Sequence, residues 1–257
     1  KVSKMAKELK LPLTCIGIPK TVDNDLPITD CSPGFGSVAK YVATSTLEAG
    51  LDVKSMSETS TKVFILEVMG RHAGWIAAAS ALAARNETDP PHIILMPEVP
   101  FAKKKFIDKV KQTVANEGFC VVVASEGTRY KNGMFLADSG LTDAFGHKQL
   151  GGVAPVLAQM ISSIGLKNHW AVSDYLQRSA RHISSKTDLD QAYAVGKKAV
   201  EFALAGKNAV MPVIKRLSDK PYKWKIESAS LSKVANVEKT LPKGYISKDG
   251  FRVTSKG

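Results

Sequence analysis

The sequence predicts an α/β fold in which helices cover both faces of a mostly parallel sheet. Short runs rich in Val, Ile, Leu and Phe alternate along the chain with longer amphipathic stretches, as in strands joined by crossover helices. With 257 residues, 44% of them hydrophobic, the chain is long enough to bury a large core. Polar residues and glycines also gather after the expected strands, where open α/β sheets bind ligands.

The strands are expected where short apolar runs are bounded by Gly, Pro or a charged residue, at Leu13–Ile18, Lys62–Val68, His92–Met96, Phe119–Ala124, His169–Val172 and Ala209–Ile214. The helices are expected in the amphipathic stretches Phe35–Ala49, Ala73–Ala84, Lys103–Asn116, Val153–Ile164 and Leu189–Ala205. Two loops, Ser55–Lys62 and Tyr130–Gly152, separate these elements, and the second is long enough to suggest a functional role. The lysine-rich end, 218–257, gives mixed signals and receives no assignment.

The composition narrows the function classes. Lys and Arg number 36 against 24 Asp and Glu, a formal charge of +12, which suits anionic partners such as nucleic acid, acidic lipid or phosphorylated metabolites. Three cysteines are too few for a disulfide framework or a zinc cluster, so a reducing cytoplasm is expected. A mean hydropathy of −0.08 and strand-sized apolar runs exclude a membrane-spanning helix. The chain begins with Lys1 and lacks a signal-peptide pattern, so we expect it to be part of a longer protein.

The first chemical candidate is the segment Lys20-Thr21-Val22-Asp23-Asn24-Asp25, which follows an expected strand. Its ammonium and hydroxyl groups can hold a phosphate, and a carboxylate there can accept the proton of a sugar hydroxyl. A polar turn in which Asp caps a helix is the alternative that this spacing alone leaves open.

Three further segments combine polar groups with expected strand ends. In Met69-Gly70-Arg71, Gly70 permits close backbone approach and Arg71 can bind two phosphate oxygens; a surface Arg at a helix start is the alternative. Glu126, after the strand Phe119–Ala124, either binds sugar hydroxyls or caps a turn. The segment 174–179, Asp-Tyr-Leu-Gln-Arg-Ser, either binds an anion or forms a solvated basic face.

Together these segments resemble the phosphofructokinase family. The match lies in Gly17-Ile18-Pro19-Lys20-Thr21-Val22-Asp23-Asn24-Asp25, in Glu67-Val68-Met69-Gly70-Arg71-His72-Ala73-Gly74 and in Tyr175-Leu176-Gln177-Arg178-Ser179, in the family's order and spacing over nearly all of 1–206. The resemblance implies two similar Rossmann-like three-layer lobes. Residues 1–32 with 177–216 would be part of the first, donor-side lobe and 33–176 the second, sugar-phosphate lobe, while 217–257 stays poorly assigned.

The resemblance also implies catalytic roles. Asp23 would be the base that takes the proton from the 1-hydroxyl of fructose 6-phosphate, and Arg71 would neutralise charge on the transferred phosphoryl group. Thr21 and Asp25 would support the sugar end and the reacting centre. The residue just before the catalytic Thr is a lysine in pyrophosphate-dependent members and typically Gly in ATP-dependent bacterial members. Lys20 therefore makes the chain similar to the pyrophosphate-dependent members.

The sugar phosphate would be bound by a second group of residues. The resemblance implies that Met69, Gly70 and Glu126 hold the sugar and that Tyr175 and Arg178 bind its 6-phosphate. Lys62 matches a basic position that in the family reaches a neighbouring subunit's site. His169 falls near another basic position that binds phosphate. The implied cofactor is Mg²⁺, and the implied partners are fructose 6-phosphate, pyrophosphate and further copies of the chain in a dimer or tetramer. No nucleic-acid or membrane partner is expected.

The family's glycine-rich segment for the phosphoryl donor has no counterpart in the chain and is expected upstream of it, which makes the first lobe incomplete. The isolated chain is therefore expected to be inactive or nearly so. The alternatives are an ATP-dependent 6-phosphofructokinase, which Lys20 disfavours, and a non-catalytic binding or regulatory subunit of the same fold, which the presence of Asp23 disfavours. Nucleic-acid binding rests on the +12 charge alone, because the lysines are spread without interleaved aromatic residues.

Overall fold

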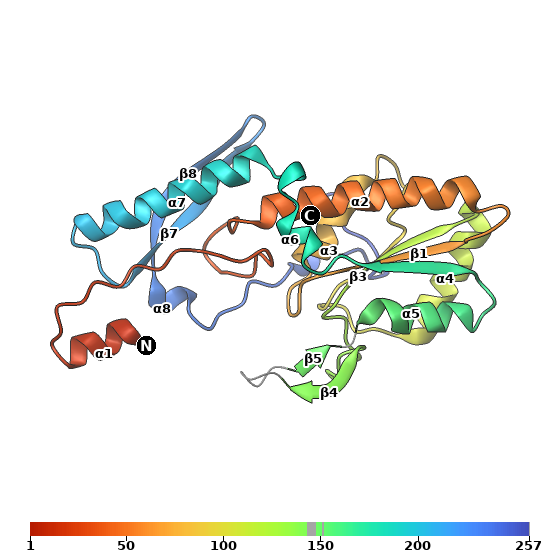
Figure 1. The fold of residues 1–257 in the computed structure, drawn as a ribbon, viewed down its shortest axis with the longest axis horizontal. Helices are drawn as coiled ribbons and strands as arrows, with labels where there is room; N and C mark the ends of the chain where they lie inside the picture. Colours follow the sequence, from red (N-terminus) through yellow and green to blue (C-terminus); the bar gives the residue numbers. More distant parts are fainter. Residues whose placement is uncertain (143–147, 151, 257) are drawn as a thin grey trace. The chain divides into compact units, whose positions relative to one another are not determined.

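The structure is a computed structural model that describes residues 1–142, 148–150 and 152–256 (Figure 1). The chain divides into two compact units, and each is described by itself. Unit 1 comprises residues 1–37 and 184–239, and unit 2 comprises 38–183 and 240–257. The sequence-based boundaries at 32/33 and 176/177 lie a few residues before those of the structure. The lysine-rich end, 218–257, is divided between the units, with 218–239 in unit 1 and 240–257 in unit 2.

Unit 2 is built on a four-stranded parallel sheet, which confirms the predicted sheet type. Its strand order is β2-β3-β1-β6, with β1 at Val63–Val68, β2 at Ile93–Leu95, β3 at Cys120–Ser125 and β6 at Asn168–Val172. β1 and β3 pair in register from Val63–Cys120 to Val68–Ser125, so the two strands end side by side.

Successive side chains of a strand point to opposite faces of the sheet, and here both faces carry apolar side chains that helices cover. Val63, Ile65 and Val122 share a core with α4 (Lys103–Glu117) and α5 (Val153–Ser162). On the opposite face, Phe64 and Val121 pack with α2 (Phe35–Met56). Helices α2 and α5 accordingly lie on opposite sides of the sheet (Figure 1).

Shorter elements complete unit 2. They are α3 (Trp75–Ala79), the 3-10 turns Ser80–Ala83, Arg181–Ile183 and Lys243–Tyr245, α6 (Leu176–Ser179), and the antiparallel strands β4 (Asp138–Thr142) and β5 (Lys148–Leu150). The strands β4 and β5 lie inside the region expected to be a loop, Tyr130–Gly152, so that expectation was wrong in part. The helix expected over Ala73–Ala84 is instead split between α3 and a 3-10 turn.

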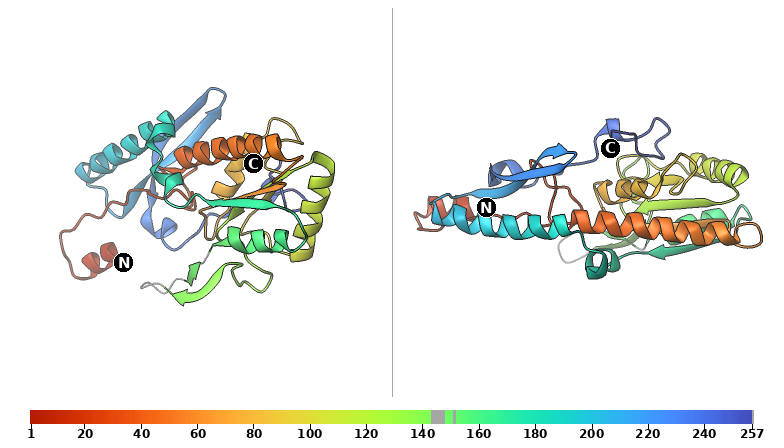
Figure 2. Two further views of the ribbon diagram at one scale, coloured as in Figure 1. Left: turned by 45° about the vertical axis from the view of Figure 1, so that its right-hand side comes forward. Right: turned by 90° about the horizontal axis from the view of Figure 1, so that it is seen from above.

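Unit 1 is organised around an antiparallel hairpin rather than a parallel sheet. β7 (Val210–Asp219) pairs with β8 (Tyr222–Ser230), and α7 (Lys186–Leu204) packs along both strands (Figure 2). The short helices α1 (Val2–Glu8) and α8 (Leu231–Val234) belong to the same unit.

The strand expected at Leu13–Ile18 is reduced to a single parallel bridge between Ile16 and Val210. Gly17 N–H donates to the Val210 carbonyl at 2.9 Å, and Ala209 N–H donates to Cys15 at 2.9 Å. A strand forms only where a neighbouring strand accepts and donates its hydrogen bonds, and this pairing is limited to the start of β7. The bridge fixes the point from which the Lys20–Asp25 segment begins.

Candidate active site

The predicted catalytic segment is a tight loop of unit 1 that follows the Ile16 bridge. Thr21 Oγ1 accepts a hydrogen bond from the Asp23 N–H at 3.1 Å, which closes the first turn. Asn24 is buried, with 2% of its surface exposed, and adopts a left-handed conformation with φ +55°. Asn tolerates this region better than most residues. Asp23 and Asp25, both partly buried, therefore adjoin a buried Asn24 in the chain, while Lys20 is exposed.

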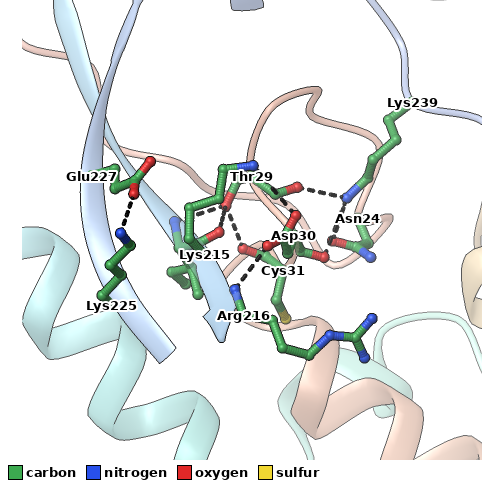
Figure 3. Close-up of polar contacts among 10 residues, drawn as sticks. Asn24, Thr29, Asp30, Cys31, Lys215, Arg216, Lys225, Glu227 and Lys239 are labelled. Atoms are coloured by element: carbon green, nitrogen blue, oxygen red, sulfur yellow. Dashed lines mark hydrogen bonds and ion pairs between the residues drawn. The ribbon is translucent and has the colours of Figure 1, made fainter. Parts of the chain in front are cut away.

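The far end of this loop is anchored on β7 (Figure 3). The Thr29 hydroxyl accepts a hydrogen bond from the Ile214 N–H at 3.0 Å and donates one to the Cys31 carbonyl at 2.8 Å. Asp30 N–H donates to the Ile214 carbonyl at 2.9 Å, and the Asp30 carboxylate accepts from the Arg216 N–H at 2.8 Å. The loop is thus tied to β7 through backbone and side-chain hydrogen bonds.

In unit 2, the turn after β1 (residues 69–71) and the turn after β3 (residues 126–127) are hydrogen-bonded to each other, and we call the pair the double turn. Glu126 N–H donates to the Val68 carbonyl at 2.9 Å. The buried Ser125 hydroxyl donates to the Gly70 carbonyl and accepts from the Gly127 N–H at 3.2 Å. This arrangement brings Glu126 to the turn that carries Met69, Gly70 and Arg71.

Two glycines make this double turn possible. Gly70 has φ +123°, a conformation that side chains disfavour. A Cβ on Gly127 would lie only 2.0 Å from the Arg71 carbonyl oxygen and 2.7 Å from that of Gly70. The backbone of the β3 turn therefore rests directly on the backbone of the β1 turn.

The third predicted segment joins the same double turn through Gln177. This side chain is buried, with 2% exposed; its Oε1 accepts from the Met69 N–H at 3.2 Å and its Nε2 donates to the Asp174 carbonyl at 2.9 Å. On the exposed side of the segment, the Arg178 guanidinium lies 4.1 Å from the centre of the Tyr175 ring. The predicted sugar residues and the predicted 6-phosphate residues are therefore neighbours in unit 2.

Lys62 and His169 lie apart from this cluster. Lys62 immediately precedes β1, at the end opposite to Met69, and its ammonium donates to the Ser57 carbonyl. His169 is the second residue of β6 and pairs with Phe64, near the start of β1. Lys62 is separated from the double turn by the six residues of β1, about 20 Å, and His169 by about four residues, roughly 13 Å, so neither lies at the double turn of its own chain.

Buried Glu67 is a structural member of the motif before Met69. Burial raises its pKa, and the N–H of Ala154, which donates to its Oε2 at 2.8 Å, opposes that shift. The carboxyl group thus satisfies a donor at the start of α5, one of the unpaired N–H groups that a helix N-terminus presents. This contact fixes α5 against the strand that leads into the double turn.

Over 1–142, 148–150 and 152–256, no group of three or more His, Cys, Asp or Glu side chains could hold a metal. Within these ranges Mg²⁺ would therefore find no such cluster of three side chains. In the same ranges, no helix combines the length and apolar character needed to cross a membrane.

Several supporting residues escaped sequence reasoning. Ser125, Gly127 and Gln177 lie inside or beside the recognised segments, yet their contacts depend on separations such as 108 residues between Gln177 and Met69. Lys239 lies in a region without any recognised motif and contacts Asn24 across 215 residues.

A protein-family model and the similar known proteins indicate the same family for this chain. The phosphofructokinase family model matches residues 1–203. The pyrophosphate--fructose 6-phosphate 1-phosphotransferase of Halomonas elongata is 64% identical over 255 residues, covering 99% of this chain and 61% of the relative. That of Xanthomonas campestris pv. campestris is 59% identical over 258 residues, covering 100% and 62%.

A solved structure shows the same similarity. The pyrophosphate-dependent phosphofructokinase of Marinobacter aquaeolei is 60% identical, with a TM-score of 0.88, over 99% of this chain and 61% of that one. The chain thus spans about three fifths of the length of the curated relatives it matches.

Proposed function

Because the chain belongs to the phosphofructokinase family, we propose that the protein containing it transfers a phosphoryl group from pyrophosphate to the 1-hydroxyl of fructose 6-phosphate. The observation that carries the proposal is the loop Lys20–Asp25, which holds an ammonium, a hydroxyl and two carboxylates within six residues and is turned by the Asp23 N–H bond to Thr21 and by the left-handed Asn24. Relatives that are 59–64% identical over 99–100% of this chain bear the name of that reaction.

In the proposed reaction, Asp23 is the general base. Its carboxylate accepts the proton of the 1-hydroxyl while that oxygen attacks a phosphorus of pyrophosphate. The new C–O–P link forms as the P–O–P bond breaks, and inorganic phosphate leaves. Lys20 and Arg71 offset the negative charge on the phosphate groups, since positioning and charge neutralisation dominate catalysis of phosphoryl transfer.

The double turn of unit 2 is the proposed sugar-phosphate site. Met69, Gly70 and Glu126 would hold the sugar, and the neighbouring Tyr175 and Arg178 would bind the 6-phosphate. The ring of Tyr175 supports the Arg178 guanidinium, which can give two parallel hydrogen bonds to phosphate oxygens. Thr21 and Asp25 would support the sugar end from the catalytic loop.

Three further features of the protein belong to the proposal. Mg²⁺ is the proposed divalent ion, carried by the phosphate oxygens of the donor, because Mg²⁺ commonly binds through substrate phosphates and retained waters. Lys62 and His169, which lie away from the double turn of their own chain, are proposed to serve the site of a second copy in a dimer or tetramer. The proposed location is the cytoplasm.

The proposal is tested with the full-length protein and fructose 6-phosphate, using pyrophosphate or ATP as donor. We expect Mg²⁺-dependent formation of fructose 1,6-bisphosphate with pyrophosphate and little or none with ATP. Turnover with ATP and none with pyrophosphate would show that ATP is the donor and would overturn the proposal. Binding of fructose 6-phosphate without turnover by either donor would indicate a regulatory subunit.

A further inference from the structure

The ammonium group of Lys239 is held by the catalytic loop of unit 1 (Figure 3). Its Nζ lies 2.9 Å from the Thr29 carbonyl oxygen, 3.3 Å from Asn24 Oδ1 and 3.4 Å from the Asp30 carbonyl oxygen. An ammonium has three protons to donate, and these three acceptors belong to two separate parts of the loop. One side chain thereby joins residue 24 to residues 29 and 30.

The contact with Asn24 reaches the middle of the proposed catalytic segment. Asn24 lies between Asp23 and Asp25, and its Oδ1 also accepts the Ser32 N–H at 3.0 Å. The backbone of Lys239 adds a second link, because its N–H donates to the Asp25 carbonyl at 2.6 Å. The two carboxylates are therefore flanked by groups that Lys239 binds directly.

The other side of the loop is already fixed by β7. Thr29 and Asp30 are hydrogen-bonded to Ile214. Lys239 bonds to the carbonyls of these same two residues and to Asn24. It thus connects the anchored end of the loop to the end that carries Asp23.

The position of Lys239 has an electrostatic cost. Burial lowers its pKa to about 8, although the neighbouring Cys31, Asp30 and Asp25 favour the charged form and Lys215 opposes it. A partly desolvated ammonium is stabilised here by carbonyl and amide oxygens. A surface lysine such as Lys225, paired with Glu227 at 2.6 Å on β8, carries no such link to the loop.

We propose that Lys239 is a positioning residue for catalysis, because it holds the loop that carries Asp23 and Asp25 in one conformation. This inference rests on the proposed phosphotransferase function. Lys239 does not contact substrate in this account; it acts through Asn24 and the loop carbonyls. A reacting group displaced by about 1 Å can lose on the order of 100-fold in rate, so a loosened loop should lower kcat.

The test compares Lys239→Met with Lys225→Met in the full-length protein. Both variants remove one positive charge from the same unit, but only the first removes the three loop contacts. We expect kcat with pyrophosphate to fall by about 10–100-fold in Lys239→Met, while KM for fructose 6-phosphate changes much less. The Lys225→Met variant should match the unmodified protein.

Amide hydrogen exchange across residues 24–32 gives a readout that needs no activity. We expect faster exchange in Lys239→Met, particularly at the Ser32 amide, and no change in Lys225→Met. If kcat stays at the Lys225→Met value, or if kcat falls while exchange is unchanged, the positioning role is wrong. If Lys239→Met does not fold, Lys239→Gln, which keeps a hydrogen-bond donor, replaces it. We expect this variant to lower kcat and to speed amide exchange by a smaller amount. No change in either measurement would overturn the role.

The two measurements also separate this inference from the proposed function. An unmodified full-length protein without pyrophosphate-dependent turnover would overturn the function. The exchange data would still decide whether Lys239 orders the loop, and unchanged exchange in Lys239→Met would overturn the inference on its own.

Discussion

Gly127→Ala should disable the proposed sugar-phosphate site by separating two turns that now rest on each other. The added Cβ would lie 2.0 Å from the Arg71 carbonyl oxygen, and the neighbouring atoms are backbone that cannot rotate away. Ordinary contact begins near 3.4 Å, so one turn has to move by about 1.4 Å. Both turns carry residues of the proposed site, 69–71 on one and Glu126 on the other, so either movement disturbs it.

The magnitude follows from this shift. A misplacement of about 1 Å costs on the order of 100-fold, so kcat/KM for fructose 6-phosphate should fall by about that factor in the full-length protein. Overpacking of this kind also destabilises a fold by about 1–3 kcal/mol, which thermal unfolding would register. Steady-state kinetics measure the fall in kcat/KM, and calorimetric titration with fructose 6-phosphate measures the loss of sugar binding.

Gly244→Ala is the matched control, because a Cβ there meets no atom within 4 Å. It should leave binding and turnover unchanged. Ser125→Ala, which removes the hydroxyl contact to Gly70 without adding an atom, should weaken sugar binding in the same direction. Normal kinetics in Gly127→Ala, with a folded protein, would refute the argument that the two turns must touch.

Two further predictions concern the donor and the acid stability. Lys20→Gly should lower pyrophosphate-dependent turnover by about 10–100-fold, the equivalent of losing about 1.5–3 kcal/mol from a charged contact to the leaving phosphate; unchanged turnover would make Lys20 a surface residue. Burial lowers the pKa of His92 to about 4, so unfolding takes up a proton below pH 6.5 and the free energy of unfolding should fall by up to about 3 kcal/mol between pH 6.5 and pH 4. Denaturant titrations should show this loss reduced in His92→Leu, and an equal loss in both proteins would contradict the assignment.

The elements of unit 2 were predictable where one local pattern was strong. Helix α4 begins at the expected Lys103, and β1 and β3 begin within one residue of the expected starts, because buried strands read as continuous apolar runs. Unit 1 was less predictable. Strand β8 alternates Tyr222, Trp224 and Ile226 with charged residues, a period-2 signal that the high lysine content of this end obscured.

The site divides in the same way. Arg71 and Glu126 were accessible because they come just after β1 and β3, and the carboxyl ends of parallel strands are the expected place for chemistry. Asp23 was singled out by the same rule, although the strand expected before it is only a bridge at Ile16. The residues that support them were not, since Ser125 and Lys239 act through hydrogen bonds to Gly70 and Asn24, 55 and 215 residues away. No local pattern in a sequence encodes such pairings, which appear only when the chain is folded.

The most direct test of the central claim is the turnover of Asp23→Ser in the full-length protein, measured at saturating fructose 6-phosphate and pyrophosphate. If Asp23 is the general base, turnover should fall by about 10²–10⁴-fold, while the affinity for fructose 6-phosphate changes much less. The exposed Asp52→Ser, on α2, is the control and should retain normal turnover. Normal turnover of Asp23→Ser at saturation, together with a collapse of sugar affinity, would contradict the account and make Asp23 a binding residue.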